Sequence, residues 1–373
     1  MELKTSLGNV WQLIRELVAE GIAEADEYRE WASDNEEFIA DILQYRRLDG
    51  MPAASALIKP FFHPEEPLIG VNYTPVAHNT LFRFPSGWTP TLRICRGLVF
   101  SRRGALMALP FPKFFNDREH EETSNIRDDT HCLAAEKRDG HLGIIFKHQS
   151  RWMVTTRGSF TSKTAIIAQA MLDKEQAKNP HGWRNIDKRA TLLVEIIHPE
   201  TKVIVDYGGA ERFDLIGGYN AGSLKPIKAT KLTMFGHWLG FDPVLGTMTT
   251  VGKLREEVKR LNVKNHEGYV ATMPGGQRVK FKYAGYVSKM MGDKFTYPYM
   301  MRRMLEGDFK ARIADLDPEI QMRAHEMALN LVACLEPSDT NERVKQLVSL
   351  MPQPQRSSEA LALCRKFAKL NTV

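Results

Sequence analysis

The chain carries a lysine beside a tight turn, in the tetrapeptide Lys137-Arg138-Asp139-Gly140. Apolar stretches typical of strands stand on both sides of it, at residues 132–137 and 142–147. An Asp-Gly turn can hold the lysine at the end of a strand, where its amine can reach a phosphate. The pattern alone has little specificity, because average residue frequencies give it by chance in roughly one chain in ten of this length.

Two further lysines, Lys280 and Lys282, stand two residues apart in another strand-like stretch. On a strand this spacing puts both ammonium groups on one face, while Val279, Phe281 and Tyr283 occupy the other. Two aligned cations repel each other unless an anion lies between them, and a triphosphate is a suitable anion. The plainer alternative is a solvent-exposed edge strand.

Two glutamates complete the candidate set. Glu195 lies inside the apolar run 192–197, where an ionised carboxylate is costly to bury unless it is paired, binds a metal or takes part in catalysis. Glu267 comes directly before Gly268, at the start of the hairpin that carries the lysine pair. A structural ion pair is the alternative for either glutamate.

Gathered in one cleft, these five side chains would form a nucleotidyl-transfer site. A lysine attacks phosphorus only as the free amine, and neighbouring cations disfavour its charged form. The same cations offset the charge of the phosphates, and carboxylates can hold a divalent ion. The residues therefore suggest nucleotidyl transfer through a covalent lysine phosphoramidate.

The ordered elements resemble the motifs of the covalent nucleotidyltransferases, the superfamily of ATP-dependent ligases and mRNA capping enzymes. The matching segments are Lys137-Arg138-Asp139-Gly140, Thr156-Arg157-Gly158, Leu193-Val194-Glu195, Glu267-Gly268-Tyr269-Val270 and Val279-Lys280-Phe281-Lys282. Residues 95–100, 112–116, 195–199 and 204–207 resemble more narrowly the bacteriophage tRNA-repair RNA ligase family. The resemblance covers about residues 70–290.

The resemblance implies an ATP-dependent RNA ligase that uses ATP and Mg²⁺ or Mn²⁺. Lys137 would be the nucleophile that becomes linked to AMP, in a turn shaped by Asp139 and Gly140. The implied catalytic residues are Lys137, Asp139, Glu195, Glu267, Lys280 and Lys282. Glu195 and Glu267 would hold the metal and contact the sugar, and the lysine pair would contact the α-phosphate and the leaving pyrophosphate.

The resemblance also implies a set of nucleotide-binding residues. They are Arg96, Lys113, Phe115, Glu136, Gly140, Arg157 and Gly268. Arg96 and Lys113 would contact phosphates, and Phe115 would pack beneath the nucleotide. Arg157 stands where the family has a lysine, which keeps the charge but not the geometry.

The implied reaction joins 5′-phosphate and 3′-hydroxyl RNA ends through lysine-AMP and an AMP-capped RNA end, in RNA or tRNA repair. The basic residues of the helical tail that could contact the RNA backbone are Arg302, Arg303, Lys310, Arg312, Lys345, Arg365, Lys366 and Lys369. One alternative is a DNA ligase or capping enzyme, which usually continues into a strand-rich OB fold. Another is a catalytically inactive RNA-binding relative.

The elements that position these residues predict an α+β fold: an antiparallel-sheet nucleotidyltransferase domain, similar to ATP-grasp ligases, with a helical lead-in and an all-helical C-terminal domain. Helices are predicted over 5–24, from a capping box at 33–36 onward, and over 162–178, 319–335, 341–351 and 358–370. Prolines predict irregular structure over 52–67. Strands are predicted at 96–100, 105–109, 132–137, 142–147, 152–156, 192–197, 203–207, 213–217, 269–273 and 278–283. The predicted domains are 1–69, 70–290 and 291–373.

Composition sets wider limits. The 373 residues are 43% hydrophobic and 26% charged, as in ordinary globular proteins, and the net charge of +6 only mildly favours polyanionic partners. The four cysteines form no C-x-x-C pair, so they predict neither a zinc cluster nor a disulfide framework. Since no apolar run approaches the roughly eighteen residues of a membrane span, we expect a cytoplasmic monomer without membrane contact, in the host cytoplasm if a phage encodes it.

Overall fold

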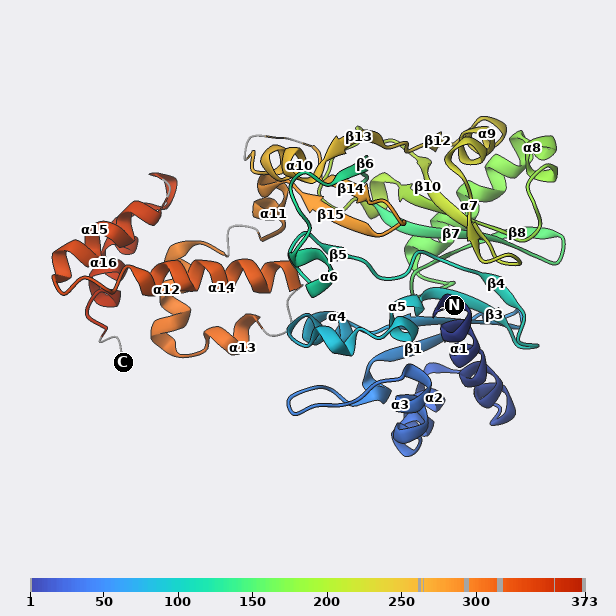
Figure 1. Ribbon diagram of the computed structural model, residues 1–373, viewed down its shortest axis with the longest axis horizontal. Coiled ribbons are helices and arrows are strands. Elements are labelled where there is room, and N and C mark those ends of the chain that lie inside the picture. Colours follow the sequence, from blue (N-terminus) through green and yellow to red (C-terminus); the bar gives the residue numbers. More distant parts are fainter. Residues whose placement is uncertain are drawn as a thin grey trace. The chain divides into compact units, whose positions relative to one another are not determined.

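The computed structural model describes residues 2–260, 263, 265–291, 295–313, 318–351 and 353–370. The chain forms two compact units, Met1–Tyr286 and Val287–Val373 (Figure 1). The predicted domain 291–373 also contains residues 292–294, 314–317, 352 and 371–373, which lie outside the described residues. The first unit holds three mainly antiparallel sheets with helices packed against them, so the predicted α+β class is confirmed.

Three helices begin the first unit. They are α1 (Glu2–Ala19), α2 (Ala25–Asp34) and α3 (Glu36–Leu43). Helix α1 begins and ends earlier than predicted, and α2 is not among the predicted helices. The predicted capping box is wrong, because Ser33 lies inside α2. The Glu36 carboxylate instead accepts hydrogen bonds from the backbone N–H groups of Ala54 and Ser55.

The first sheet shares one hydrophobic core with these helices. Its strands are β1 (Ile58–Phe62), β2 (Leu68–Tyr73), β3 (Arg96–Ser101) and β4 (Leu106–Ala108), with α4 (Pro75–Thr80) and α5 (Pro90–Ile94) between β2 and β3. Strands β3 and β4 are predicted, but β1 lies in the stretch predicted to be irregular. It tolerates Pro60 because it is an edge strand.

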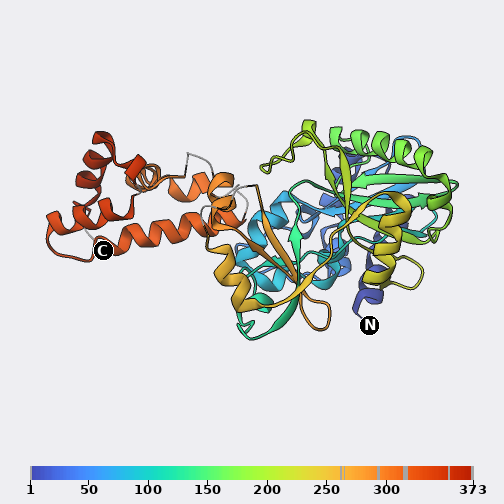
Figure 2. The ribbon, with the colours of Figure 1, turned by 90° about the horizontal axis from the view of Figure 1, so that it is seen from above.

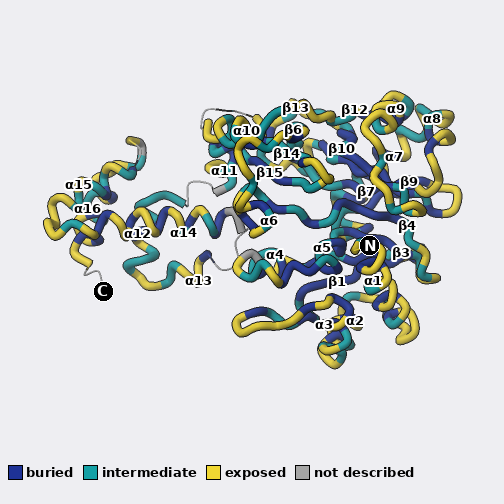
Figure 3. Tube along the Cα trace, viewed as in Figure 1, coloured by how far each residue is buried: buried dark blue, intermediate teal, exposed yellow. Residues whose placement is uncertain are grey.

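The second sheet forms the centre of the first unit. It consists of β7 (His141–His148), β8 (Arg151–Thr156), β9 (Ala190–Ile197), β10 (Arg212–Asn220), β11 (Lys225–Pro226) and β12 (Asp242–Pro243). The helices beside it are α7 (Lys163–Lys178), α8 (Pro180–Arg184) and α9 (Ala229–Leu239). Side chains alternate between two cores: Ile145 of β7 packs with the α7 and α9 residues, whereas Ile144 and Phe146 join the core of the first sheet. Figures 2 and 3 show α7 beside this sheet and the burial of its central strands.

The strand predicted at 203–207 is wrong, because this segment is part of an irregular loop between β9 and β10. The backbone N–H groups of Ile204 and Val205 donate to the Asp139 carboxylate, at 2.8 and 2.6 Å. A buried carboxylate therefore takes the hydrogen bonds that a neighbouring strand would have received.

The third sheet carries the predicted nucleophile. Its strands, in spatial order, are β13 (Thr247–Thr250), β6 (His131–Lys137), β14 (Gly268–Thr272), β15 (Arg278–Lys282) and β5 (Phe115–Asn116). The predicted hairpin of β14 and β15 is confirmed. Helix α10 (Val251–Val258) packs its Val251 and Leu254 side chains into the apolar core of this sheet, and α6 (Glu121–Ser124) follows β5.

The second unit is helical in its described residues, and the chain enters it within α11 (Ala284–Met291). Its other helices are α12 (Tyr297–Glu306), α13 (Phe309–Ile313), α14 (Pro318–Ala333), α15 (Thr340–Leu350) and α16 (Ser358–Phe367). The three helices predicted here are confirmed as α14, α15 and α16, and they share a core that includes Met300, Leu331 and Phe367. Among the described residues, no helix combines the length and the apolar character that a membrane span needs.

Candidate active site

The register of the third sheet brings three predicted residues to one end of adjacent strands. Lys137, the last residue of β6, lies opposite Gly268 of β14, and Gly268 lies opposite Lys282 of β15. Glu267 precedes Gly268, and its side chain is only 5% exposed. The Lys137 Nζ atom donates to Glu267 Oε2 at 2.7 Å, and the Lys282 Nζ atom lies 3.8 Å from Glu267 Oε1. One buried carboxylate therefore pairs with two lysines from different motifs.

Gly268 has a structural reason for being glycine. Its φ angle is +150°, and a Cβ atom at this position would lie 1.9 Å from the backbone oxygen of Phe281. A side chain here would push β14 and β15 apart and displace Glu267 and Lys282, which stand beside this close approach.

Glu195 joins the turn after Lys137 to the central sheet. Its Oε1 atom accepts a hydrogen bond from the Gly140 N–H group at 3.1 Å. Burial raises the pKa of Glu195 to about 7, with Glu267 adding to the rise and Lys137 opposing it. The two glutamates and the nucleophile candidate therefore influence one another electrostatically, although they come from two sheets.

Asp139 occupies an anchoring position. The residue is 5% exposed. Its carboxylate accepts hydrogen bonds from the backbone N–H groups of Ile204 and Val205 and, at 2.7 Å, from the Tyr286 hydroxyl. The Tyr207 hydroxyl accepts from the Asp139 N–H group at 2.9 Å. A cavity of about 230 Å³ adjoins this turn and loop. Its lining includes Gly140, Ile197 and Tyr207. Asp139 thus holds the turn after Lys137, the loop and the cavity wall together.

We expect Asp139→Asn to lower the free energy of unfolding by roughly 2–4 kcal/mol, because an amide removes the charge that accepts these buried hydrogen bonds and places a donor opposite other donors. Urea unfolding monitored by tryptophan fluorescence would measure the change. The matched control is Asp206→Asn in the same loop, where the side chain is 58% exposed. Its carboxylate pairs with Lys202 at the surface and accepts one hydrogen bond from the neighbouring Gly208 N–H group, so its loss should cost little. Equal stabilities of the two variants would contradict the anchoring position of Asp139.

A second group of charges lies beside the lysine hairpin. Lys113 and Glu119, both with 3% exposed side chains, are 3.5 Å apart. Burial lowers the pKa of Lys280 well below its usual value, and Lys113 acts in the same direction. The Arg96 Nη1 atom is a buried donor without a hydrogen-bond partner among the described residues. An anion placed here would satisfy that donor and relieve the repulsion between the lysines.

The remaining predicted residues have protein partners of their own. Arg157 Nη1 donates to the Tyr73 hydroxyl at 3.1 Å. Glu136 pairs with Arg138 and His266, at 2.8 and 3.2 Å.

Phe115 is 1% exposed and stacks on the ring of His120, with centroids 4.0 Å apart. Phe115 is thus an interior residue that supports Lys113, whose Nζ atom lies 4.8 Å from its ring centre.

The structure adds residues that the sequence analysis does not single out. Tyr286 donates to Asp139, Glu119 pairs with Lys113, and Arg255 pairs with Asp117. Tyr286 lies in the first turn of α11, four residues after Lys282 at the end of β15, and this nearness in sequence is a signal that could have been used. Glu119 stands in an irregular segment, and Arg255 lies on the amphipathic helix α10, where the periodic pattern does not indicate its partner Asp117.

The described residues contain no group of three or more His, Cys, Asp or Glu side chains that could hold a metal ion. The pair Glu195 and Glu267 nevertheless fits Mg²⁺ or Mn²⁺, because such ions often bind one or two carboxylates and complete their shell with phosphate oxygens and water. Burial raises the pKa of Glu195 to about 7 and Glu267 adds to the rise, although Lys137 opposes it, so further positive charge beside Glu195 would favour its ionised form. A divalent cation would supply that charge.

A protein-family model described as RNA ligase matches residues 94–290, which is more than half of the chain. A protein of Thermovibrio ammonificans that carries the provisional name RNA ligase is 29% identical over 124 residues, covering 32% of this chain and 32% of that protein. The matched segment thus spans about a third of that relative's length.

Solved structures show a weaker similarity. An RNA ligase variant of Naegleria gruberi, solved with ATP and Mn, aligns with a TM-score of 0.36 and 15% identity over 43% of this chain and 52% of that one. A structure described as an archaeal ATP-dependent RNA ligase aligns with a TM-score of 0.39 and 16% identity, over 65% and 74% of the two chains. Because both scores are below 0.5, the family assignment rests on the family model alone.

Proposed function

The chain belongs to the RNA ligase family, and we propose that it joins RNA ends with ATP through an AMP-linked Lys137. The observation that carries this proposal is the arrangement of Lys137, Glu267 and Lys282, in which a buried carboxylate fixes the amine beside a second cation. The cations gathered around it fit a triphosphate, and the family requires RNA as the final substrate.

In the first step, the Lys137 amine would attack the α-phosphorus of ATP. A nitrogen–phosphorus bond forms, the bond to the pyrophosphate oxygen breaks, and the amine loses a proton. Glu267 Oε2 lies 2.7 Å from the Nζ atom, within reach for accepting that proton. Lys280 and Lys282 would stabilise the charge on the α-phosphate and on pyrophosphate as it leaves.

The metal and the other phosphate contacts support this step. Glu195 and Glu267 would hold Mg²⁺ or Mn²⁺, which offsets phosphate charge when bound. Arg96 would donate its unpartnered Nη1 hydrogen to a phosphate oxygen, and Lys113 would add a second contact. Arg157 is held by Tyr73, so its guanidinium is already oriented before the nucleotide binds.

In the second step, a 5′-phosphate oxygen of RNA would attack the AMP phosphorus, and the lysine amine would leave. In the third, a 3′-hydroxyl would attack the activated 5′-phosphorus, and AMP would leave. Lys345, Arg365, Lys366 and Lys369 are exposed in the helical unit and are candidates to contact the RNA backbone. Arg302, Arg303 and Arg312 already pair with acidic residues of the same unit.

A DNA ligase or capping enzyme is the alternative. Such enzymes usually continue after the last lysine motif into a strand-rich OB fold. Among the described residues after Lys282, every regular element is a helix. This observation favours RNA ligation, in the repair of RNA or tRNA, and the experiment below compares a cleaved tRNA with an unstructured RNA as substrate.

We expect the purified chain with magnesium and labelled ATP to form a covalent AMP adduct that survives denaturation, and to form none with labelled GTP. It should then join 5′-phosphate and 3′-hydroxyl RNA ends with release of AMP. A GMP adduct would refute the ATP-dependent reaction. Sealing a nicked tRNA anticodon loop no faster than an unstructured oligonucleotide would refute the tRNA specialisation while leaving RNA ligation intact.

A further inference from the structure

Glu119 is a buried carboxylate placed among the cations that would bind phosphate. Its Oε1 atom lies 3.5 Å from Lys113 Nζ, and its side chain is 3% exposed. Its Oε2 atom accepts a hydrogen bond from the Asn116 N–H group at 2.6 Å. Neither the proposed chemistry nor the sequence motifs give this residue a function, yet an anion at this place competes with a phosphate for the same partners.

The fold holds Glu119 in this position through a tight turn. The Glu119 N–H group donates to the Asn116 carbonyl at 3.1 Å, and Arg118 between them has a φ angle of +64°. The Asp117 N–H group donates to the carbonyl of Lys280 at 2.9 Å, which ties the turn to the lysine hairpin. Glu119 and Lys280 are therefore positioned relative to each other through the backbone.

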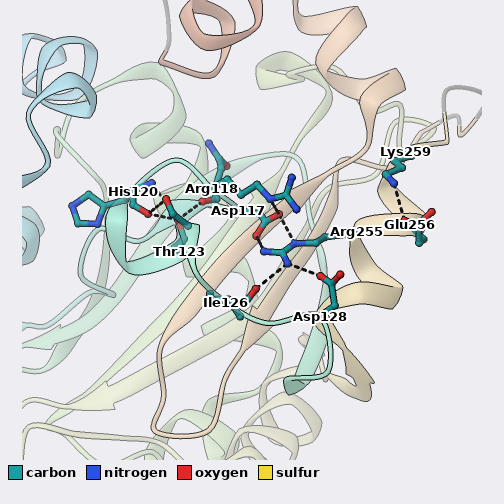
Figure 4. Close-up of polar contacts among 11 residues, drawn as sticks. Asp117, Arg118, His120, Thr123, Ile126, Asp128, Arg255, Glu256 and Lys259 are labelled. Carbon is teal, nitrogen blue, oxygen red and sulfur yellow. Dashed lines mark hydrogen bonds and ion pairs between the residues drawn. The ribbon is translucent and has the colours of Figure 1, made fainter. Parts of the chain in front are cut away.

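An ion-pair network secures the outer side of the same turn (Figure 4). The Arg255 guanidinium donates to both carboxylate oxygens of Asp117, at 2.7 and 2.9 Å, and to the Ile126 carbonyl at 2.9 Å. Asp128 also pairs with Arg255. Because the Arg255 side chain is only 12% exposed, this network is poorly screened by solvent and keeps the turn rigid.

The charges around Glu119 oppose the effect of burial on its pKa. Burial raises the pKa of the Glu119 carboxyl, but Lys113, Lys280 and the hydrogen bond from the Asn116 N–H group together hold that pKa below its usual value. His78 also lowers it. Burial lowers the pKa of Lys280, as do the cations Lys113, Lys282 and Arg96, whereas Glu119 opposes this change. Glu119 therefore compensates the charge of Lys113 and Lys280 within this group of cations.

We propose that Glu119 is a positioning residue, which holds Lys113 and Lys280 in place for a nucleotide's phosphates. This inference rests on the proposed function, because it assigns the phosphates of ATP to this cluster. Without the carboxylate, Lys113 and Lys280 repel each other, and Lys280 loses its proton at a lower pH. The two lysines would then keep their positions only when a bound phosphate offsets their mutual repulsion.

The test is the pH dependence of ATP use in adduct formation, measured as KM and as the maximal rate from pH 6 to 10. In the wild type, KM is expected to rise as the pH increases and Lys280 loses its proton. Glu119→Gln keeps the size of the side chain, and in this variant the rise in KM should begin about one pH unit lower. In the pH range between the two onsets, the KM of the variant should be roughly tenfold higher than that of the wild type. Glu119→Asp keeps the charge at a greater distance and should shift the profile by about half as much.

The matched control is Glu121→Gln, which removes the same charge from an exposed position two residues away. Its profile should coincide with that of the wild type. If Glu119→Gln fails to fold, as judged by thermal unfolding, the profile of Glu119→Asp decides. The inference would be overturned if the KM profile of either variant coincided with that of the wild type. It would also be overturned if a variant had a lower maximal rate and an unchanged KM profile. If the wild type itself forms no adduct, the proposed function fails instead.

Discussion

Lys137→Ala is expected to form no AMP adduct, a loss of at least four orders of magnitude in the rate of the first step. Alanine has no amine to attack phosphorus, and a reaction routed through water cannot give a covalent protein adduct. Labelled ATP followed by denaturing electrophoresis measures the loss, and peptide mass spectrometry locates the AMP in the wild type. The fold should persist, because the Lys137 side chain is 22% exposed and stands at the end of β6.

Two comparisons make the Lys137 result specific. The control Lys188→Ala removes an exposed lysine from the same unit and should label like the wild type. RNA that already carries AMP on its 5′ end needs no lysine nucleophile, so Lys137→Ala should still seal it to a 3′-hydroxyl end. An adduct that persists in Lys137→Ala would refute the assignment of the nucleophile. Failure to seal the activated RNA would indicate a folding defect in the variant.

Glu267→Gln is expected to slow adduct formation at saturating ATP by roughly a hundredfold or more. Glutamine keeps the size of the side chain but removes the charge that pairs with Lys137 at 2.7 Å and with Lys282 at 3.8 Å. The amine would then lose its fixed direction and its proton acceptor, and one of the two carboxylates proposed for the metal would be gone. Rapid-quench measurement of a single turnover separates this rate from product release.

The pattern of the Glu267→Gln defect also carries information. The maximal rate should fall more than KM rises, because the interaction acts on the attacking amine rather than on ATP alone. The matched control is Glu256→Gln on α10, an exposed glutamate that pairs with Lys259 (Figure 4) and should leave the rate unchanged. A Glu267→Gln enzyme that keeps its maximal rate and shows only a higher KM would refute a direct effect on Lys137.

Much of the sheet structure follows from local patterns. Short apolar runs locate β6, β7, β8 and the β14–β15 hairpin, because these strands end at glycine or polar residues. Strands β7 and β8 bury both faces, since Ile144 and Met153 lie in one core and Ile145 and Val154 in another. The early strand β1 escapes this reasoning, since Pro60 breaks the expected pattern and is tolerated only at a sheet edge. Residues 203–207 have the sequence pattern of a strand but form none, because the backbone N–H groups of Ile204 and Val205 donate to the Asp139 carboxylate instead of to a neighbouring strand.

The candidate site shows the same division. Lysine and glutamate residues at the observed spacings identify which groups are available, and the resemblance to nucleotidyltransferases relates them to one reaction. Their mutual distances depend on register: Lys137 and Glu267 are 130 positions apart and meet because β6 pairs with β14 at Gly268. A shift of one residue would turn these side chains to the opposite face.

By itself, the sequence determined the fold class, most strands and the set of residues suited to nucleotidyl transfer, because these depend on periodicity and on residue types. Only the tertiary structure decided that Asp139 anchors a loop, that Phe115 lies in the interior and that Glu119 compensates the charge of Lys113 and Lys280. These assignments depend on which buried polar groups find partners. These partners come largely from chain segments that are far apart in the sequence. They are brought together because a buried charge without a partner is energetically costly.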